Sequence, residues 1–193
     1  MIARPLCALA VAAVLMVAGC GTPNSSAPAL DQADQAPPLE VVPSLELERY
    51  LGDWYEIASF PQFFQRGCVA TQASYSLRED GRIRVLNRCR DGALDADWRE
   101  AEGVAWVVDP DDSSARLVVS FFWPFKGDYW VIDLGEDYEF AVVGHPERTY
   151  LWILSRTPTL PADVYDEILE RIRAQGYDLG PLVKTLQPGV DGS

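Results

Sequence analysis

From residue 45 onward, apolar and polar residues alternate in short runs separated by turn residues. Alternation with a period of two is typical of strands that bury one face. The predicted strands are 54–60, 69–77, 83–90, 98–108, 115–122, 128–134, 139–143 and 150–156. Their links are short and rich in Asp, Glu, Gly and Pro. A meander of such strands favours an antiparallel up-and-down barrel, whose closure removes exposed sheet edges, over a sandwich with longer crossovers.

One helical pattern follows the last predicted strand. Residues 159–161 open it, acidic residues follow in its first turns, and Gly176 ends it. Its apolar positions share one face, as in a helix packed on a surface: Val164, Ile168, Leu169 and Ile172. The predicted fold class is all-β: an eight-stranded antiparallel up-and-down β-barrel with one C-terminal α-helix packed on the barrel. A short strand is expected near residues 182–186.

The first 44 residues have a different pattern. Arg4 precedes an unbroken apolar run over residues 6–19, which is typical of a secretory signal and too short for a membrane span of about 20 residues. Residues 21–44 are mostly Pro, Ala, Ser, Gln and Asp, and this composition predicts a flexible tether. The expected domains are a signal peptide (1–19), a lipidated N-terminus with its tether (20–44), the barrel (45–188) and a short tail (189–193).

The small residues before Cys20 resemble the lipobox of bacterial lipoproteins. The resemblance implies cleavage before Cys20, lipid on its sulfur and on its new amino group, and stable anchoring by more than one acyl chain. Gly21 stands where an aspartate often retains such proteins at the inner membrane, so the resemblance favours the outer membrane. The alternative is an ordinary secretory signal that happens to contain a cysteine.

The chain is acidic, with 29 Asp and Glu against 16 Lys and Arg and a formal net charge of −13. This charge argues against nucleic-acid binding and against charge-driven adsorption to anionic lipid. His145 is the single histidine, which rules out a His-rich metal site and weakens any catalytic triad. We therefore expect no metal, no cofactor and no enzymatic activity. Glu56 is the one carboxylate that alternation points inward; it could be an acid–base group, or be paired with Arg156 or a backbone amide.

Three motifs occur in order along the chain. Residues 50–57, Tyr-Leu-Gly-Asp-Trp-Tyr-Glu-Ile, resemble the Gly-x-Trp signature at the first strand of lipocalins. Residues 136–138 and 154–156 are similar to the second and third lipocalin motifs. Further stretches resemble the bacterial outer-membrane branch of that family: 49–58, 73–78, 119–125 and 150–158. The resemblance implies a barrel that holds fatty acids or lysophospholipids, a lipid anchor in the outer membrane with the domain facing the periplasm, and often a homodimer.

Three motif residues are expected to be structural. Gly52 lets the chain approach the barrel closely, and Trp54 plugs its closed end. Arg156 lies over the Trp54 ring, a cation–π contact worth roughly 0.5–2 kcal/mol.

If Trp54 and Arg156 point inward, they fix which alternate residues of the first and eighth predicted strands face the interior. In the other strands, the more apolar set of alternate residues is taken as inward. The candidate ligand-binding residues are Ala58, Phe60, Tyr75, Asn87, Ala105, Val119, Phe121, Tyr129, Val143, Tyr150 and Trp152. Small and aromatic residues together are suited to an acyl chain, and Asn87, Tyr129 and Tyr150 are expected to meet a polar head near the mouth. The same side chains could instead fill a solid core. The resemblance favours a cavity.

The run Phe121-Phe122-Trp123-Pro124-Phe125 is too apolar for alternation to bury completely. Its exposed part could form a partner surface, a membrane contact or a ligand gate, or could be a strand end packed under a loop.

Cys68 and Cys89 flank a hairpin that turns at residues 79–81. Folding brings them close together, so we expect a disulfide worth on the order of 3 kcal/mol. The alternative is a reactive thiol.

Three functions remain open. The preferred one is a carrier or store of fatty acids or lysophospholipids at the outer membrane. The second is a carrier of another apolar ligand, such as a haem or a carotenoid fragment, although a haem would need a tyrosine as axial ligand. The third is a structural envelope lipoprotein whose barrel is filled.

Overall fold

The computed structural model describes residues 37–111 and 113–189. The predicted signal peptide, the lipidated Cys20 and most of the tether lie outside the described residues. Within those described ranges, no helix has the length and apolar content that a membrane span requires.

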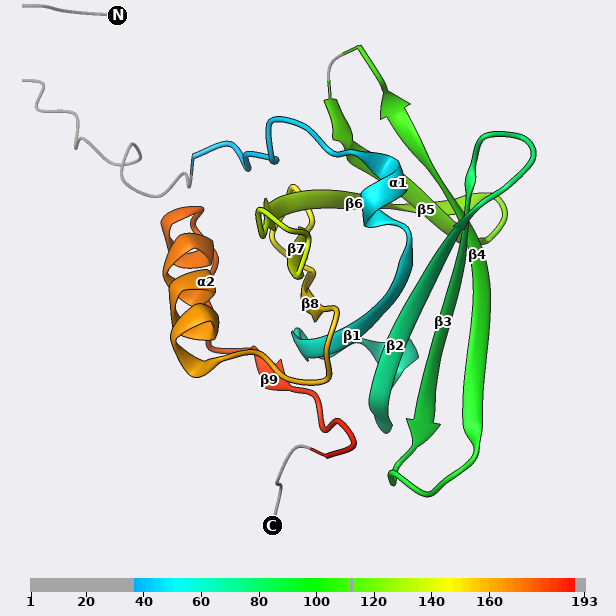
Figure 1. The fold of residues 1–193 in the computed structure, drawn as a ribbon, viewed down its shortest axis with the longest axis vertical. Helices are drawn as coiled ribbons and strands as arrows, with labels where there is room; N and C mark the ends of the chain where they lie inside the picture. The colour runs from blue at the N-terminus through cyan, green and yellow to red at the C-terminus, as the bar shows by residue number, and fades with distance from the viewer. Residues whose placement is uncertain (1–36, 112, 190–193) are drawn as a thin grey trace, which may run out of the picture. The chain divides into compact units, whose positions relative to one another are not determined.

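Eight antiparallel strands close into a barrel (Figure 1). Each strand pairs with its neighbour in sequence, and β1 pairs with both β2 and β8. The strands are β1 (Gly52–Ser59), β2 (Cys68–Leu77), β3 (Ile83–Asp91), β4 (Trp98–Asp109), β5 (Ser113–Phe122), β6 (Phe125–Leu134), β7 (Phe140–Gly144) and β8 (Leu151–Ser155). The remaining elements are α1 (Leu47–Tyr50), the 3-10 helix η1 (Phe63–Gln65), α2 (Ala162–Ala174) and β9 (Val183–Lys184). The predicted eight-stranded barrel followed by one packed helix is confirmed.

Helix α2 lies along the outside of the barrel (Figure 1). Ile168 and Ile172 of its apolar face are fully buried, and Tyr165 joins them. Their partners are outward-facing residues of β6, β7 and β8: Ile132, Phe140, Val142, Leu151 and Ile153. Every residue of β7 is therefore buried, because the barrel interior covers one face and the α2 layer covers the other.

The predicted inward positions of Ala58 and Phe60 are wrong. The pairing of β1 with β8 shifts between Glu56 and Ala58, so that Glu56 lies opposite Leu154 but Ala58 lies opposite Ile153. One extra residue in a strand reverses the faces of all residues that follow it. Ala58 and Phe60 consequently pack in the core under α2 and not inside the barrel.

Strand β9 fills the gap that opens where β1 and β2 diverge. Strand β1 pairs with β2 only over residues 52–55, and Ala58 and Ser59 pair with β9 instead. Gln187, just after β9, is 1% exposed and donates its side-chain amide to the carbonyl oxygens of Glu56 and Thr71 at 2.8 and 2.9 Å. The C-terminal segment thereby joins two strands that no longer bond to each other.

The packed domain begins before residue 45, where the sequence places its boundary. Leu39 is buried against the core under α2, and the amide of Val42 donates to the carbonyl of Val131 at 3.0 Å. From there the segment crosses from the α2 side toward α1 (Figure 1). The last residues of the predicted tether are thus part of the folded body.

Candidate functional site

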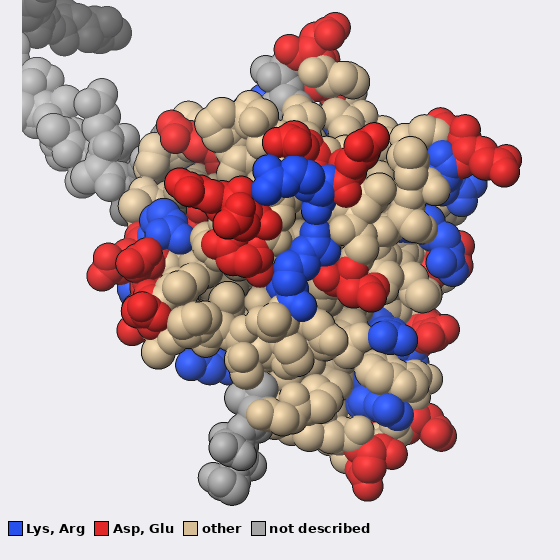
Figure 2. All heavy atoms as spheres, viewed as in Figure 1, with Lys and Arg blue, Asp and Glu red and all other residues tan. Residues whose placement is uncertain are grey.

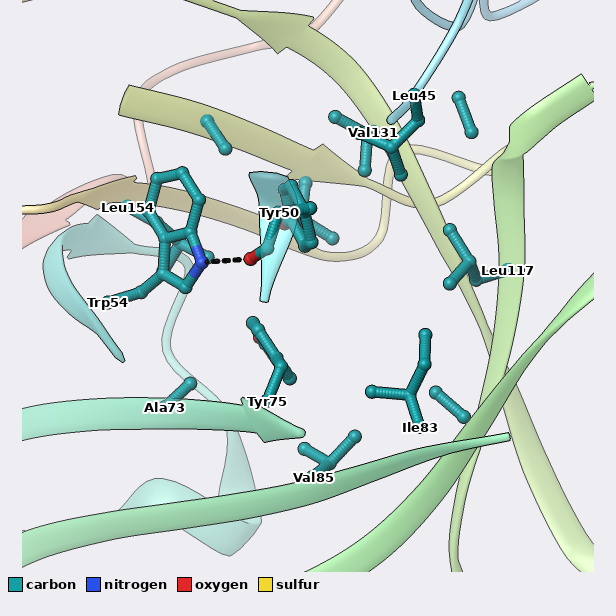
Figure 3. Packing of buried hydrophobic residues seen from close by; sticks show 14 of the residues in the cluster. Leu45, Tyr50, Trp54, Ala73, Tyr75, Ile83, Val85, Leu117, Val131 and Leu154 are labelled. Carbon is teal, nitrogen blue, oxygen red and sulfur yellow. Dashed lines mark hydrogen bonds between the residues drawn. The ribbon is translucent and has the colours of Figure 1, made fainter. Parts of the chain in front are cut away.

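The interior of the barrel is closed at the end where β1 begins. Trp54 is fully buried, and its indole N–H donates to the carbonyl of Tyr50 at 2.9 Å (Figure 3). The guanidinium of Arg156 lies 3.7 Å from the centre of the Trp54 ring and donates to the carbonyls of Asp53 and Arg49 at 2.9 and 2.7 Å. Gly52 has a φ of +94°, and a Cβ there would lie 3.4 Å from that guanidinium. Glycine suits this position because it adopts positive φ without strain.

Three tyrosines fill the space above Trp54. The hydroxyl of Tyr129 forms hydrogen bonds with those of Tyr50 and Tyr75, at 2.7 and 2.9 Å. Burial raises the pKa of Tyr75 to about 12 and raises the pKa of Tyr50 and of Tyr129 well above the ordinary value. All three are therefore neutral near pH 7. We call Tyr50, Trp54, Tyr75 and Tyr129 the floor.

The floor leaves almost no free space. Its cavity measures about 10 Å³, close to the least volume that holds one water molecule. The lining residues are Tyr50, Tyr75, Ile83, Val85, Ala105, Leu117 and Tyr129. Tyr129 was expected to meet a polar head near the mouth, and this expectation is wrong because its hydroxyl lies in the floor and is bonded to two other tyrosines. Any molecule larger than a water would have to lie above this layer.

The opposite end of the barrel is the mouth. Because neighbouring strands are antiparallel, the β1–β2, β3–β4, β5–β6 and β7–β8 links all lie there. Interior side chains become more exposed toward it: Val119, Phe121 and Trp152 are half-buried against the interior core, and Ala101 is exposed. Val143, opposite Trp152 on β7, is fully buried.

Asn87 has an unsatisfied polar atom. It lies between Ala73 on β2 and Ala101 on β4, on the inward face of β3. Its Oδ1 atom is buried and has no hydrogen-bond partner among the described residues. Such atoms are uncommon in folded proteins, so this oxygen is an acceptor available to a polar group inside the barrel.

Tyr150 and Trp152 form an aromatic pair at the mouth. Their rings stack with centres 5.8 Å apart and an interplanar angle of 11°. The Trp152 indole N–H donates to Oε1 of Gln65 at 3.1 Å, which connects the pair to η1.

Glu56 is 5% exposed and lies on the inward face beside this pair. One carboxylate oxygen accepts from the hydroxyls of Ser59 and Thr185, at 3.0 and 2.5 Å, and the other accepts from the Gln65 amide at 2.8 Å. The expected partners were Arg156 or a backbone amide, and these are wrong. Gln65 and Thr185 could not be found from alternation, because they come from a loop and from the C-terminal segment.

The aromatic run at the β5–β6 turn is divided between two environments. Phe121 faces the interior, where a Cβ on Gly103 would come within 2.9 Å of its ring. Phe122, Trp123 and Phe125 are 78%, 84% and 77% exposed, so packing under a loop is excluded for these three. An open groove of about 610 Å³ lies beside them and is lined in part by Trp106, Trp123, Arg82 and Glu102.

Cys68 and Cys89 form a disulfide that joins the mouth ends of β2 and β3, with their Cα atoms 5.3 Å apart. Neither sulfur is a free thiol in this structure. In the part of the chain that the structure describes, no three His, Cys, Asp or Glu side chains gather in a way that could hold a metal ion.

A closed antiparallel barrel with an apolar interior and one flanking helix defines a class of small-ligand-binding proteins. Residues 45–187 match the family model of the lipocalin-like domain, and the chain belongs to the lipocalin family. Over 187 residues it is 41% identical to the outer membrane lipoprotein Blc of Escherichia coli (strain K12), covering 96% of this chain and 97% of that protein.

Two further comparisons agree with this assignment. The chain is 42% identical over 162 residues to temperature-induced lipocalin-1 of Arabidopsis thaliana, covering 77% of this chain and 83% of that protein. Insecticyanin from the tobacco hornworm Manduca sexta superposes with a TM-score of 0.61 at 20% identity, over 78% of this chain and 85% of that chain. The second comparison shows the shared fold alone.

Proposed function

We propose that the protein is a lipid-anchored outer-membrane lipocalin that stores or transports fatty acids or lysophospholipids for membrane maintenance. Its anchor is the lipid on Cys20, and its barrel faces the periplasm. The observation that carries the proposal is the unpartnered Oδ1 atom of Asn87 in an interior that is lined mostly by apolar side chains and becomes more exposed toward the mouth. The similarity to a protein named as an outer membrane lipoprotein supports the location.

Binding in this proposal is passive burial. An acyl chain enters at the mouth and contacts Val119, Phe121 and Trp152, and each buried methylene contributes roughly 0.8 kcal/mol. The floor limits how deep the chain can go. The Asn87 side chain then forms a hydrogen bond with a polar group of the ligand. Its buried oxygen accepts from a donor, or, with the amide flipped, its nitrogen donates to an acceptor.

Particular residues argue for or against the two alternative functions, a carrier of another apolar ligand and a structural lipoprotein. A haem carrier would use a tyrosinate ligand, and the raised pKa values of Tyr50, Tyr75 and Tyr129 disfavour tyrosinate in the floor. The small floor cavity favours the third candidate, a structural lipoprotein with a filled barrel. Acidic and basic side chains are interspersed on the face seen in Figure 2, with no continuous basic surface there.

The test compares two tryptophans at the mouth end. Trp152 lies inside the barrel, whereas Trp98 contacts the outward-facing Arg88 and Arg90. We expect Trp152→Ala to weaken binding of lysophospholipid and of fatty acid at least about tenfold, since it removes a large aromatic contact. Trp98→Ala is expected to leave binding unchanged.

Binding is measured by native mass spectrometry on the chain carrying Cys20→Ser, purified without detergent. Thermal unfolding of each variant shows that it is folded. If folded Trp152→Ala binds as tightly as the parent, the interior site is wrong. If the parent neither retains nor takes up an acyl lipid, the barrel is filled and the proposed function fails.

A further inference from the structure

Exposed aromatic side chains gather on two links at the mouth of the barrel. Phe63 and Phe64 of η1 are 77% and 50% exposed, and their rings meet edge to face with centres 5.2 Å apart. At the β5–β6 turn, Phe122, Trp123 and Phe125 are at least as exposed as Phe63. We call residues 61–67 and 122–126 the aromatic loops. Large apolar side chains that gather in water usually mark a surface that meets another body.

Hydrogen bonds fix both aromatic loops on the barrel. Gln65 of η1 donates to the Glu56 carboxylate at 2.8 Å and accepts from the Trp152 indole at 3.1 Å. At the β5–β6 turn, the hydroxyl of Ser120 donates to the carbonyl of Phe125 at 2.6 Å. The exposure of the rings is therefore a feature of the folded barrel.

The links at the two ends of the barrel differ in charge. The aromatic loops contain no Asp or Glu, although the chain has 29 of them, and each loop carries one exposed basic residue, Arg66 or Lys126. The links at the floor end all contain acidic residues, among them Asp80, Asp111 and Glu136. Exposed aromatic rings with basic and without acidic neighbours are typical of protein segments that lie at the interface of a phospholipid membrane.

The two aromatic loops lie on opposite sides of the mouth. In the closed ring of eight strands, β5 and β6 stand four strands away from β1 and β2. A flat bilayer can touch both loops at once, whereas a partner docked on one loop would leave the other in water. Residues 21–36 span at most ~55 Å, which is long enough for the body to turn its mouth toward a bilayer that holds a lipid on Cys20.

We propose that the aromatic loops dock the mouth of the barrel face-on against a phospholipid bilayer. The proposal rests on the lipid anchor of the proposed function and adds a second membrane contact, made by side chains. Phe63, Trp123 and the neighbouring rings insert at the boundary between head groups and acyl chains. A lipid can then pass between the bilayer and the barrel interior without crossing water. The contact is weak by itself, comparable to one acyl chain, and it orients a body that the lipid on Cys20 retains.

The test measures vesicle binding without the lipid anchor. The chain without its predicted signal peptide (residues 20–193), carrying Cys20→Ser, is mixed with vesicles of palmitoyl-oleoyl phosphatidylcholine, and flotation gives the bound fraction. A partition constant near that of one myristoyl chain, roughly 10⁴ M⁻¹, is measurable at about 1 mM lipid. We expect the parent to bind. Raising NaCl from ~0.05 M to ~0.5 M should change the constant less than about twofold, because salt screens charge attraction and leaves apolar insertion in place.

Each aromatic loop has its own variant. Trp123→Ala should lower the partition constant about tenfold and Phe63→Ala about fivefold, since each removes an inserted ring. Leu77, which is 57% exposed at the floor end, is the matched control, and Leu77→Ala should change the constant less than about twofold. Phe63 and Trp123 lie outside the interior core, so both variants should take up lysophospholipid like the parent when vesicles are absent. Thermal unfolding shows that each variant is folded.

The outcomes separate this proposal from the proposed function. A parent that takes up lysophospholipid but does not bind neutral vesicles overturns the docking and leaves the carrier function standing. Vesicle binding without lysophospholipid uptake does the reverse. Binding that weakens in only one of the two loop variants overturns the face-on arrangement. A parent that binds no vesicles and is a dimer in ultracentrifugation, with a monomeric Trp123→Ala variant, would mean that a second copy covers the loops.

Discussion

At the scale of single residues, three tyrosine hydroxyls form a chain inside the barrel. Two hydrogen bonds join Tyr50, Tyr129 and Tyr75, and each bond needs one hydroxyl proton. Ionising any member would place a negative charge in an apolar core. The closed end is therefore more stable while the tyrosines remain protonated.

These three buried tyrosines predict that the fold loses stability at alkaline pH. Burial raises the pKa of Tyr75 to about 12, against about 10 in the unfolded chain, so the folded state holds its proton more tightly. The resulting contribution is fully present below pH 10 and is lost as pH rises through 12. Two pKa units correspond to roughly 2–3 kcal/mol in the free energy of unfolding.

Urea unfolding between pH 8 and pH 12 measures the free energy of unfolding at each pH. Tyr75→Phe should make this free energy decline less steeply with rising pH. Tyr55→Phe, at a half-buried tyrosine on the other face of β1, is the control for the loss of one phenolic hydroxyl. Equal slopes for the parent and Tyr75→Phe would contradict the assignment.

At the scale of elements, the shift in β1 decides which side chains face the barrel interior. Beyond it, Ala58 faces α2 and Ser59 faces the barrel interior beside Trp152. Enlarging these two neighbours should therefore have different effects.

We expect Ala58→Leu to destabilise the fold by about 1–3 kcal/mol, because it overpacks the core under α2, and to leave lysophospholipid affinity unchanged. Ser59→Leu should obstruct the mouth and weaken lipid binding. Urea unfolding and native mass spectrometry measure the two quantities. If Ala58→Leu instead blocked lipid binding and Ser59→Leu did not, Ala58 would face the interior, and the shift in β1 would be wrong.

The same strand shows how far sequence reasoning extends. Strand count, order and the helix follow from alternation and turn residues, and Gly52 and Trp54 can be located from a short local motif. The shift after Glu56 cannot be predicted from the alternation, because Ala58 and Phe60 are apolar and would suit either the barrel interior or the core under α2. Gln65 and Thr185 reach Glu56 from distant parts of the chain, so only the folded structure brings that network together.

At the scale of the whole molecule, two apolar cores have different surroundings. The core under α2 is enclosed by the helix and by the outer faces of β6, β7 and β8. The interior core is closed by the floor at one end and becomes exposed toward the mouth at the other. The most deeply buried side chains thus lie under α2 and in the floor, while the mouth end of the interior is less buried.

The last prediction concerns the attachment of this body to a membrane. Residues 21–36 separate Cys20 from the described part, and at about 3.5 Å per residue they span at most ~55 Å. A lipid on Cys20 would keep residue 37 within that distance of the bilayer, and the net negative charge of the chain gives no second attraction to anionic lipid. We expect Cys20→Ser to move the protein from the outer-membrane fraction to the soluble periplasmic fraction, as measured by fractionation and immunoblotting. Cys7→Ser, which changes a cysteine inside the predicted signal, should leave the distribution unchanged. Retention of Cys20→Ser in the membrane pellet would mean that another contact anchors the protein, and the exposed side chains of Phe122, Trp123 and Phe125 would be the first to replace.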